Sequence, residues 1–275
     1  MVFSDSHCHP YGAKPEWLAE VLKQAEEKHV DILIGMGGFP EAWEETISLA
    51  QSHPRVLAGV GVLPWLAVPP PDEVRQQIIP TWRVVLSPDE VRQQLRKLAG
   101  RKGVVVIGEV GLQYGPNHFT GIPASPETKE VQKELFRYEL SLARETGLPL
   151  NIVSSGGSHQ DMMDILHQEI SPDLKGYKHG PPSDLTELKD WLNLGFYVSV
   201  GVRGFVTDTT PALLEVVGDI PLDRLLILTD FNAREERGSP ADIVSVAEKL
   251  ASLRGTTVEE IADITTANLK RLLKL

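Results

Sequence analysis

Hydrophobic residues along the chain form short continuous runs, which alternate with longer segments where they recur every three or four residues. The continuous runs predict strands covered on both faces, and the spaced segments predict helices that bury one stripe. Strands are expected at residues 2–9, 30–36, 56–62, 104–107, 148–153, 174–179, 196–200 and 225–229. Helices are expected at residues 15–28, 40–52, 127–145, 159–168, 185–194, 240–253 and 258–272.

Eight apolar strands separated mostly by helices predict an α/β protein. The expected fold is a closed parallel (βα)8 barrel, the TIM barrel, with its functional site at the C-terminal ends of the strands. The competing architecture is a doubly wound open sheet. The 275 residues suit one domain spanning 1–275, and no Ser/Gly tract or charge block reads as a linker.

One connection, at about residues 64–88, is longer than the others and carries a repeat. The seven residues 71–77 recur without change at 88–94, which indicates a local tandem duplication. Each copy is expected to start a helix, because each opens with Pro followed by two acidic residues. The lengthened connection either covers one side of the site or is a tolerated surface insertion. Within it, Trp65 and Trp82 either pack in the core or reach a ligand.

Charge and cysteine content narrow the possible partners. The formal net charge of -11 disfavours stable binding to duplex DNA or to an anionic membrane, because both would repel the surface. No stretch approaches the ~20 apolar residues of a membrane span, and the N-terminus lacks the pattern of a signal peptide. The single cysteine, Cys8, excludes an internal disulfide and fits a reducing compartment, so a cytoplasmic location is expected.

Candidate metal ligands begin in the first strand. His7 and His9 lie two residues apart, so in an extended strand both side chains project from one face, as does that of Asp5. This pair is either half of a metal site or two surface histidines near a chain end.

Three further residues of metal-ligand type follow predicted strands. Glu109 follows the fourth strand, His179 ends the sixth and Asp230 follows the eighth. The carboxyl ends of barrel strands share one rim, so we expect these side chains to converge with the two histidines. Histidine and carboxylate ligands suit one or two divalent ions among zinc, manganese, magnesium and iron, and Glu109 could bridge a pair.

Ordered motifs along the whole chain carry a resemblance to a known family. They are Asp5-Ser-His-Cys-His9, Gly108-Glu-Val-Gly-Leu112, Leu148-Pro-Leu-Asn-Ile152, His179-Gly180, Gly195-Phe-Tyr-Val-Ser199, Leu225-Leu-Ile-Leu-Thr-Asp230 and Thr265-Thr-Ala-Asn268. In this the chain resembles the TatD-like metal-dependent hydrolases of the amidohydrolase superfamily, which are (βα)8 barrels. Many members hydrolyse phosphodiester bonds of DNA. The resemblance implies one metal held by His7, His9, Glu109 and Asp230, and a second held by Glu109 and His179.

Two positions depart from the family pattern. Where the family has a ligand histidine and a nearby arginine after the fifth strand, this chain has Val153 and Ser155. A valine cannot bind a cation, so the second metal site is expected to be weakened. His159 lies six residues further on and either replaces that ligand or is simply exposed. If Val153 and Ser155 line the pocket, the site has also lost positive charge, which weakens the nuclease interpretation.

The expected chemistry is hydrolysis by a metal-activated water. By resemblance, Asp230 is the expected base and Glu109 the anchoring or bridging ligand. Arg203, after the seventh strand, either holds an anionic substrate or pairs with a loop carboxylate. Cleavage of single-stranded DNA is the family-based expectation. The alternatives are a small-molecule hydrolase of esters, lactones, amides or phosphotriesters, and a degenerate member that binds metal without turnover. No oligomeric state is predicted.

Overall fold

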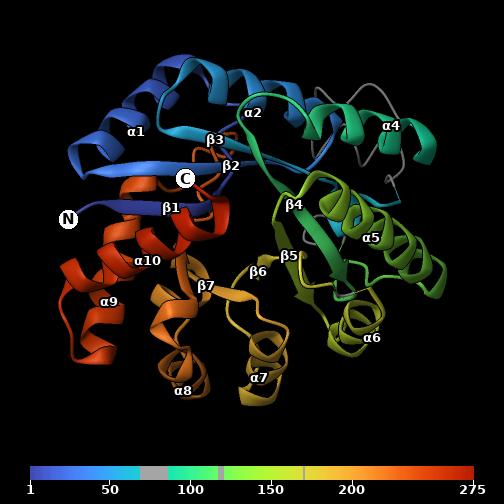
Figure 1. The fold of residues 1–275 in the computed structure, drawn as a ribbon. Helices are drawn as coiled ribbons and strands as arrows, with labels where there is room; N and C mark the ends of the chain where they lie inside the picture. The colour runs from blue at the N-terminus through green and yellow to red at the C-terminus, as the bar shows by residue number, and fades with distance from the viewer. Residues whose placement is uncertain (69–85, 117–120, 170) are drawn as a thin grey trace.

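The computed structural model describes residues 1–68, 86–116, 121–169 and 171–275. Its eight strands form one parallel sheet in the order β1 to β8, with the helices on the outside (Figure 1). Neighbouring strands are consecutive in sequence throughout, so the reversal of strand order that defines a doubly wound sheet does not occur. The predicted (βα)8 barrel is therefore confirmed, and the open-sheet alternative is wrong.

The strands line the barrel and the helices surround it. The strands are β1 (Phe3–Cys8), β2 (Val30–Gly37), β3 (Val56–Val60), β4 (Val104–Gln113), β5 (Leu150–Ser155), β6 (Gly176–Lys178), β7 (Tyr197–Gly201) and β8 (Leu225–Leu228). The α-helices are α1 (Pro15–Glu27), α2 (Pro40–Ser52), α4 (Pro88–Ala99), α5 (Pro126–Thr146), α6 (His159–Glu169), α7 (Leu185–Asn193), α8 (Pro211–Asp219), α9 (Ile243–Arg254) and α10 (Val258–Leu273).

The barrel closes between β1 and the residues that follow β8. The amide of Asp230 donates to the carbonyl of His7 at 3.1 Å, and the amide of His9 donates to the carbonyl of Phe231 at 2.8 Å. The amide of Ala233 returns to the carbonyl of His9 at 2.9 Å. These bonds hold Asp230 beside the two histidines, although more than 200 positions separate them in the chain.

Three elements differ from the sequence prediction. Strand β4 continues to Gln113, so Glu109 lies within the strand and not after it. The pairing of β4 with β5 shifts register between Ile107 and Val110, which allows the strand to continue past its apolar run. Strand β6 is shorter than expected. Helix α8 was not predicted, although Thr210 caps it by accepting from the amide of Leu213.

The second copy of the repeat starts helix α4, as predicted. Ser87 and Glu90 form a reciprocal capping box at its first turn. Arg92 and Arg96 on its exposed side pair with Glu134 and Glu145 of α5. The first copy, at residues 71–77, and Trp82 lie outside the described residues.

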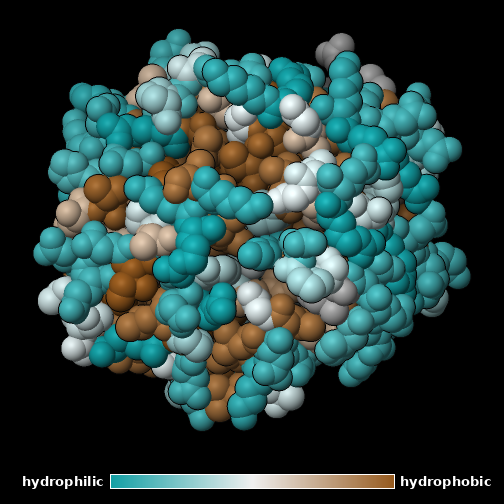
Figure 2. All heavy atoms as spheres, viewed as in Figure 1, coloured by the Kyte–Doolittle hydropathy of each residue, from teal (hydrophilic) through white to brown (hydrophobic). Residues whose placement is uncertain are grey.

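The core has one layer inside the barrel and one between the sheet and the helices. Inside, Tyr177 crosses the barrel and donates its hydroxyl hydrogen to the carbonyl of Ser6 at 2.6 Å. Between the layers, Trp43 of α2 and Trp191 of α7 are fully buried. The outer surfaces of the helices are mainly polar, and hydrophobic residues are visible chiefly in the gaps between them (Figure 2). No helix in the described ranges has the length and apolar character needed to span a membrane.

Candidate metal centre

Four of the predicted ligands come together at the C-terminal end of the barrel. His7 and His9 come from the end of β1, Glu109 from β4 and Asp230 from the segment after β8. Nε2 of His7 and Nε2 of His9 are 3.1 Å apart. Oε2 of Glu109 lies 3.6 Å from Nε2 of His7 and 3.8 Å from Nε2 of His9. Oδ1 of Asp230 lies 3.6 Å and 3.4 Å from the same two atoms.

These separations fit the coordination shell of a single cation. Ligand atoms about 2.1 Å from a metal lie about 3.0 Å apart at a right angle and about 3.4 Å apart at the tetrahedral angle. The measured distances run from 3.1 to 3.8 Å, so an inward movement of a few tenths of an ångström would complete the shell. Both ligand types, imidazole and carboxylate, suit the divalent ions expected from the sequence.

The hydrogen bonds on the far side of each imidazole support this fit. Nδ1 of His9 lies 3.3 Å from the carbonyl of Met36, which can only accept, so this nitrogen carries the proton. Nδ1 of His7 lies 2.8 Å from Oδ1 of Asn151. With both protons on Nδ1, the two Nε2 lone pairs and two carboxylate oxygens face one another. Four acceptors at this spacing repel each other unless a metal ion or bound protons lie among them.

Burial and the neighbouring charges also shift the pKa values of the side chains in this cluster. Burial lowers the pKa of His7 well below its usual value, and His179 and His9 lower it further. Burial also acts to lower the pKa of His9, but the hydrogen bond and charge of Asp230 outweigh it and raise the pKa. Burial raises the pKa of Glu109 to about 7. Against the effect of burial, His9 and the other two histidines hold the pKa of Asp230 below its usual range.

His179, one residue beyond β6, lies on the His7 side of this cluster. Its ring centroid is 4.2 Å from that of His7, and it groups with His7 and Asp230 as a candidate ligand set. Its Nδ1 is buried without a hydrogen-bond partner. The ammonium of Lys178 donates to the carbonyls of His179, Gly180 and Pro181 at 3.2 to 3.3 Å, which fixes the turn that carries the imidazole.

Asp5 links the first strand of the barrel to the segment that follows the last strand. Its Oδ1 accepts from the amides of His7 and Thr229 at 3.1 and 3.0 Å, and its Oδ2 accepts from the Thr229 hydroxyl. Asp5 is fully buried, and burial raises its pKa to about 7. Its carboxylate thus holds the backbone of β1 to the residue after β8. His7 and Asp230, two of the candidate ligands, are positioned by these hydrogen bonds. Cys8 faces away from them, as predicted, with its thiol 3.5 Å from the carbonyl of Ile34.

The residues considered at and just after the fifth strand, Val153, Ser155 and His159, add no ligand to this cluster in the described part of the chain. Val153 of β5 is buried two positions after Asn151, so its side chain shares the barrel-facing side of the strand. Ser155 is exposed. His159 begins α6 and turns toward α7, where Nε2 lies 2.9 Å from Oδ2 of Asp190. In this conformation His159 does not take the place of the ligand missing at Val153.

A pocket of about 400 Å³ opens over the cluster. His9, Glu109, His179 and Asp230 line it, together with aromatic and basic side chains. The aromatic side chains are Tyr11, Phe39 and Trp65, and the arginines are Arg203, Arg234 and Arg237. Within the described residues β5 contributes nothing to this lining, so the charge loss expected at Val153 and Ser155 falls outside the pocket.

Three residues of the site, Asn151, Arg234 and Arg237, were not predicted from the sequence. Asn151 is a polar residue in an apolar strand, a pattern that indicates a buried hydrogen bond. Arg234 and Arg237 follow the eighth strand, where the C-terminal rim of a barrel is expected to carry functional residues. Arg203 was identified, and NH1 of its guanidinium lies 4.0 Å from Oδ2 of Asp230.

The fold and the ligand set define a (βα)8 barrel with a candidate metal centre at the C-terminal ends of its strands. Comparison with known proteins gives the family. The family described as "TatD related DNase" matches residues 4–274, and the chain belongs to this family of metal-dependent hydrolases.

Relatives and solved structures agree with this assignment. The uncharacterized metal-dependent hydrolase YcfH of Escherichia coli is 31% identical, over 99% of this chain and 96% of its own length. Deoxyribonuclease TATDN3 of Homo sapiens is 28% identical, over 98% of this chain and 93% of its own. The crystal structure of the TatD homologue YjjV from Escherichia coli superposes with a TM-score of 0.78 at 23% identity, covering 99% of this chain and 98% of that one, which supports the fold.

Proposed function

We propose that this protein hydrolyses phosphodiester bonds of single-stranded DNA with one bound divalent cation. The observation that carries the proposal is the placement of Arg203, Arg234 and Arg237 around the pocket above the four ligands. In a chain with a formal net charge of -11, three arginines at one opening indicate an anionic substrate.

The charges around the pocket support a phosphodiester in particular. A divalent cation would offset the carboxylates of Glu109 and Asp230, which leaves the rim charges to act on the substrate. Glu235 is the acidic residue of the rim and lies 3.6 Å from Arg234 and 3.5 Å from Arg237. The rim therefore keeps an excess of positive charge, and guanidinium groups bind phosphate oxygens in pairs.

The aromatic residues of the pocket lining fit a nucleobase. Tyr11 and Phe39 pack edge to face at 5.3 Å, and Trp65 lies on the same lining. Bases of single strands stack on aromatic side chains with little dependence on sequence. The reacting groups lie in a hollow, so an unpaired strand can approach them more closely than a duplex can.

The chain's own residues then divide the work of hydrolysis. When bound, the cation supplies Lewis acidity and lowers the pKa of a water. His7, His9 and Glu109 anchor it. Asp230 stays ionised because its pKa is held low, so its carboxylate is available to take a proton from the attacking water. Arg203, close to that carboxylate, holds the phosphate as the phosphorus–oxygen bond breaks, and the leaving oxygen takes the proton from Asp230 directly or through solvent.

The test is a substrate panel with matched variants. Purified protein loaded with manganese, magnesium or zinc is incubated with end-labelled single-stranded DNA, duplex DNA, a phosphotriester, an ester, a lactone and an amide. We expect cleavage of the single strand and a loss of at least about a hundredfold in Asp230→Asn. Asp190→Asn, which alters a carboxylate beside His159, is the control and keeps full activity.

Other outcomes decide against the proposal. Hydrolysis of the ester, lactone, amide or phosphotriester with intact DNA would make the protein a small-molecule hydrolase. Full metal occupancy without turnover of any substrate in the panel would make it a non-catalytic metal-binding member of the family.

A further inference from the structure

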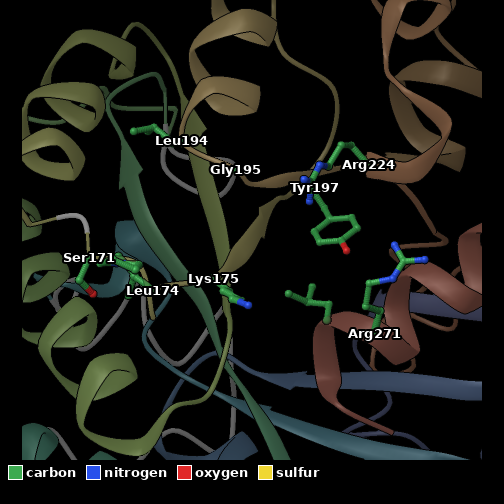
Figure 3. A pocket seen from close by; sticks show the side chains of 10 residues that line it. Ser171, Leu174, Lys175, Leu194, Gly195, Tyr197, Arg224 and Arg271 are labelled. Atoms are coloured by element: carbon green, nitrogen blue, oxygen red, sulfur yellow. The ribbon is translucent and has the colours of Figure 1, made fainter.

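A second hollow, of about 540 Å³, lies at the N-terminal ends of the strands, opposite the metal centre. Figure 3 shows it from close by. Its walls come from the segments that lead into β6, β7 and β8 and from the last turn of α10. We name it the basal pocket; its polar lining is Ser171, Lys175, Tyr197, Arg224 and Arg271. In (βα)8 barrels this end usually serves stability, so a polar hollow there calls for a separate explanation.

The lining of the basal pocket is positively charged without compensation. It includes Lys175, Arg224 and Arg271 and no aspartate or glutamate. No carboxylate oxygen of the described residues lies within 4.0 Å of any of the three cations. All three side chains line one hollow and carry a positive charge, although a chain of net charge -11 offers many acidic groups with which they could pair.

This absence of ion pairs sets the basal pocket apart from the rest of the described surface. With one exception, every other arginine in the described ranges lies within 4.0 Å of a carboxylate oxygen. The exception is Arg254, whose guanidinium donates to the carbonyls of Val217 and Ile220. Within the described ranges, Arg224 and Arg271 are thus the two arginines whose charge neither a carboxylate nor a pair of carbonyls satisfies, and both line the same hollow.

The side chains are held in position to receive a ligand. The guanidinium carbon of Arg224 lies 5.3 Å from the ring centroid of Tyr197, a cation–π contact that orients the fork. The Tyr197 ring is buried, and its hydroxyl has no hydrogen-bond partner among the described residues. In Figure 3 this hydroxyl, the Lys175 ammonium and the Arg271 guanidinium lie around the same space. Arg271 donates one hydrogen bond, of 3.2 Å, to Asn268, which leaves its other donors available.

The number and charge of the donors point to the chemistry of the ligand. A carboxylate has two oxygens in one plane and is satisfied by a single guanidinium fork. A terminal phosphate has three equivalent oxygens and up to two charges, so it can accept from groups that approach from several sides. Leu174, Leu194 and Leu272 supply an apolar wall beside these donors, against which an organic group can pack.

We propose that the basal pocket binds a phosphomonoester, with the phosphate held by Lys175, Arg224 and Arg271 and the organic part against the leucines. The site is independent of the proposed hydrolysis, because it shares no residue with the metal pocket. Its affinity should fall as salt is raised, since the donors are open to solvent.

The test is isothermal titration calorimetry of the full, metal-loaded chain with phenyl phosphate and with benzoate, which has the same ring and a carboxylate. We expect phenyl phosphate to bind at least about tenfold more tightly than benzoate. The double variant Arg224→Gln/Arg271→Gln should lose at least about tenfold in affinity for phenyl phosphate at this site. Arg96→Gln, an exposed arginine of α4 on another part of the surface, should bind as the wild type does.

A further variant, Arg203→Gln, distinguishes phenyl phosphate binding at the metal pocket from binding at the basal pocket. It alters the metal pocket and leaves the basal pocket intact. If phenyl phosphate binding survives the double variant unchanged, or if the wild type binds benzoate equally well, the proposal is overturned. Absence of any phenyl phosphate binding at millimolar concentration also overturns it. Because Arg224 contacts Tyr197, Lys175→Gln provides a second variant, at an exposed residue, that should also weaken binding.

Discussion

Oδ1 of Asn151 on β5 lies 2.8 Å from Nδ1 of His7 on β1, so the two strands are joined across the interior of the barrel. Both residues are fully buried. This contact leaves Nε2 of His7 facing His9, Glu109 and Asp230. Asn151 therefore belongs to the candidate metal centre because it orients a ligand, although it is not a ligand itself.

Replacement of Asn151 by alanine is expected to weaken metal binding by about 10- to 100-fold, because the His7 ring loses the partner that fixes its tautomer and orientation. The affinity is measured by competition with a chromophoric chelator. Asn193→Ala, at an exposed position at the end of α7, is the matched control. An Asn151→Ala protein that folds and binds metal with unchanged affinity would show that the contact does not orient His7.

The arginines above the pocket are expected to act on substrate binding. Arg203→Gln and Arg237→Gln should each raise KM for single-stranded DNA by about tenfold or more, because each removes a charge-assisted hydrogen bond to phosphate. The dependence of kcat/KM on salt should become shallower, since fewer cations contact the phosphates. Arg96→Gln should leave both quantities unchanged. If Arg203→Gln and Arg237→Gln keep the KM and the salt slope of the wild type, as Arg96→Gln should, DNA does not lie along this rim.

A buried glutamate outside the ligand cluster gives a prediction about stability and pH. Glu139 of α5 is buried and accepts from the amide of Val62 at 3.1 Å. Burial raises its pKa well above the usual 4.5, against the lowering effect of that hydrogen bond. The folded state therefore binds this proton more tightly than the unfolded chain does. Its contribution to stability is present in full below about pH 4.5 and is lost as pH rises toward the folded pKa.

Glu139→Gln keeps an acceptor for the Val62 amide and cannot ionise. The Tm of the variant relative to the wild type should therefore increase between pH 5 and pH 8, as followed by differential scanning calorimetry. Glu215→Gln, at an exposed position on α8, should show no such trend. A difference in Tm that stays constant over this range would mean that Glu139 does not carry the pH dependence.

The sequence was informative wherever local pattern determines structure. Most barrel strands contain a nearly continuous apolar run, and such runs separated by helices leave few alternative topologies. The alternation of side chains along β1 was sufficient to predict that His7 and His9 face the same way. The proline and the two acidic residues at 88–90 also predicted where α4 begins.

The parts that could not be predicted depend on contacts between distant segments. Asp230 reaches the two histidines because its backbone takes a φ of 55° and pairs with β1, neither of which a local pattern encodes. The continuation of β4 past Glu109 depends on a register shift against β5. His159 turns toward Asp190 because α7 lies beside α6, so its spacing from Val153 was a poor guide to its position.

The central claim is that this chain binds one cation through His7, His9, Glu109 and Asp230, and that Val153 leaves a second cation without a full set of ligands. The direct test is metal content per chain, measured by plasma mass spectrometry on purified wild type and on Val153→His. We expect about one metal per chain in the wild type and about two in the variant, because the new imidazole would share a face of β5 with Asn151. Two metals per chain in the wild type would contradict the claim.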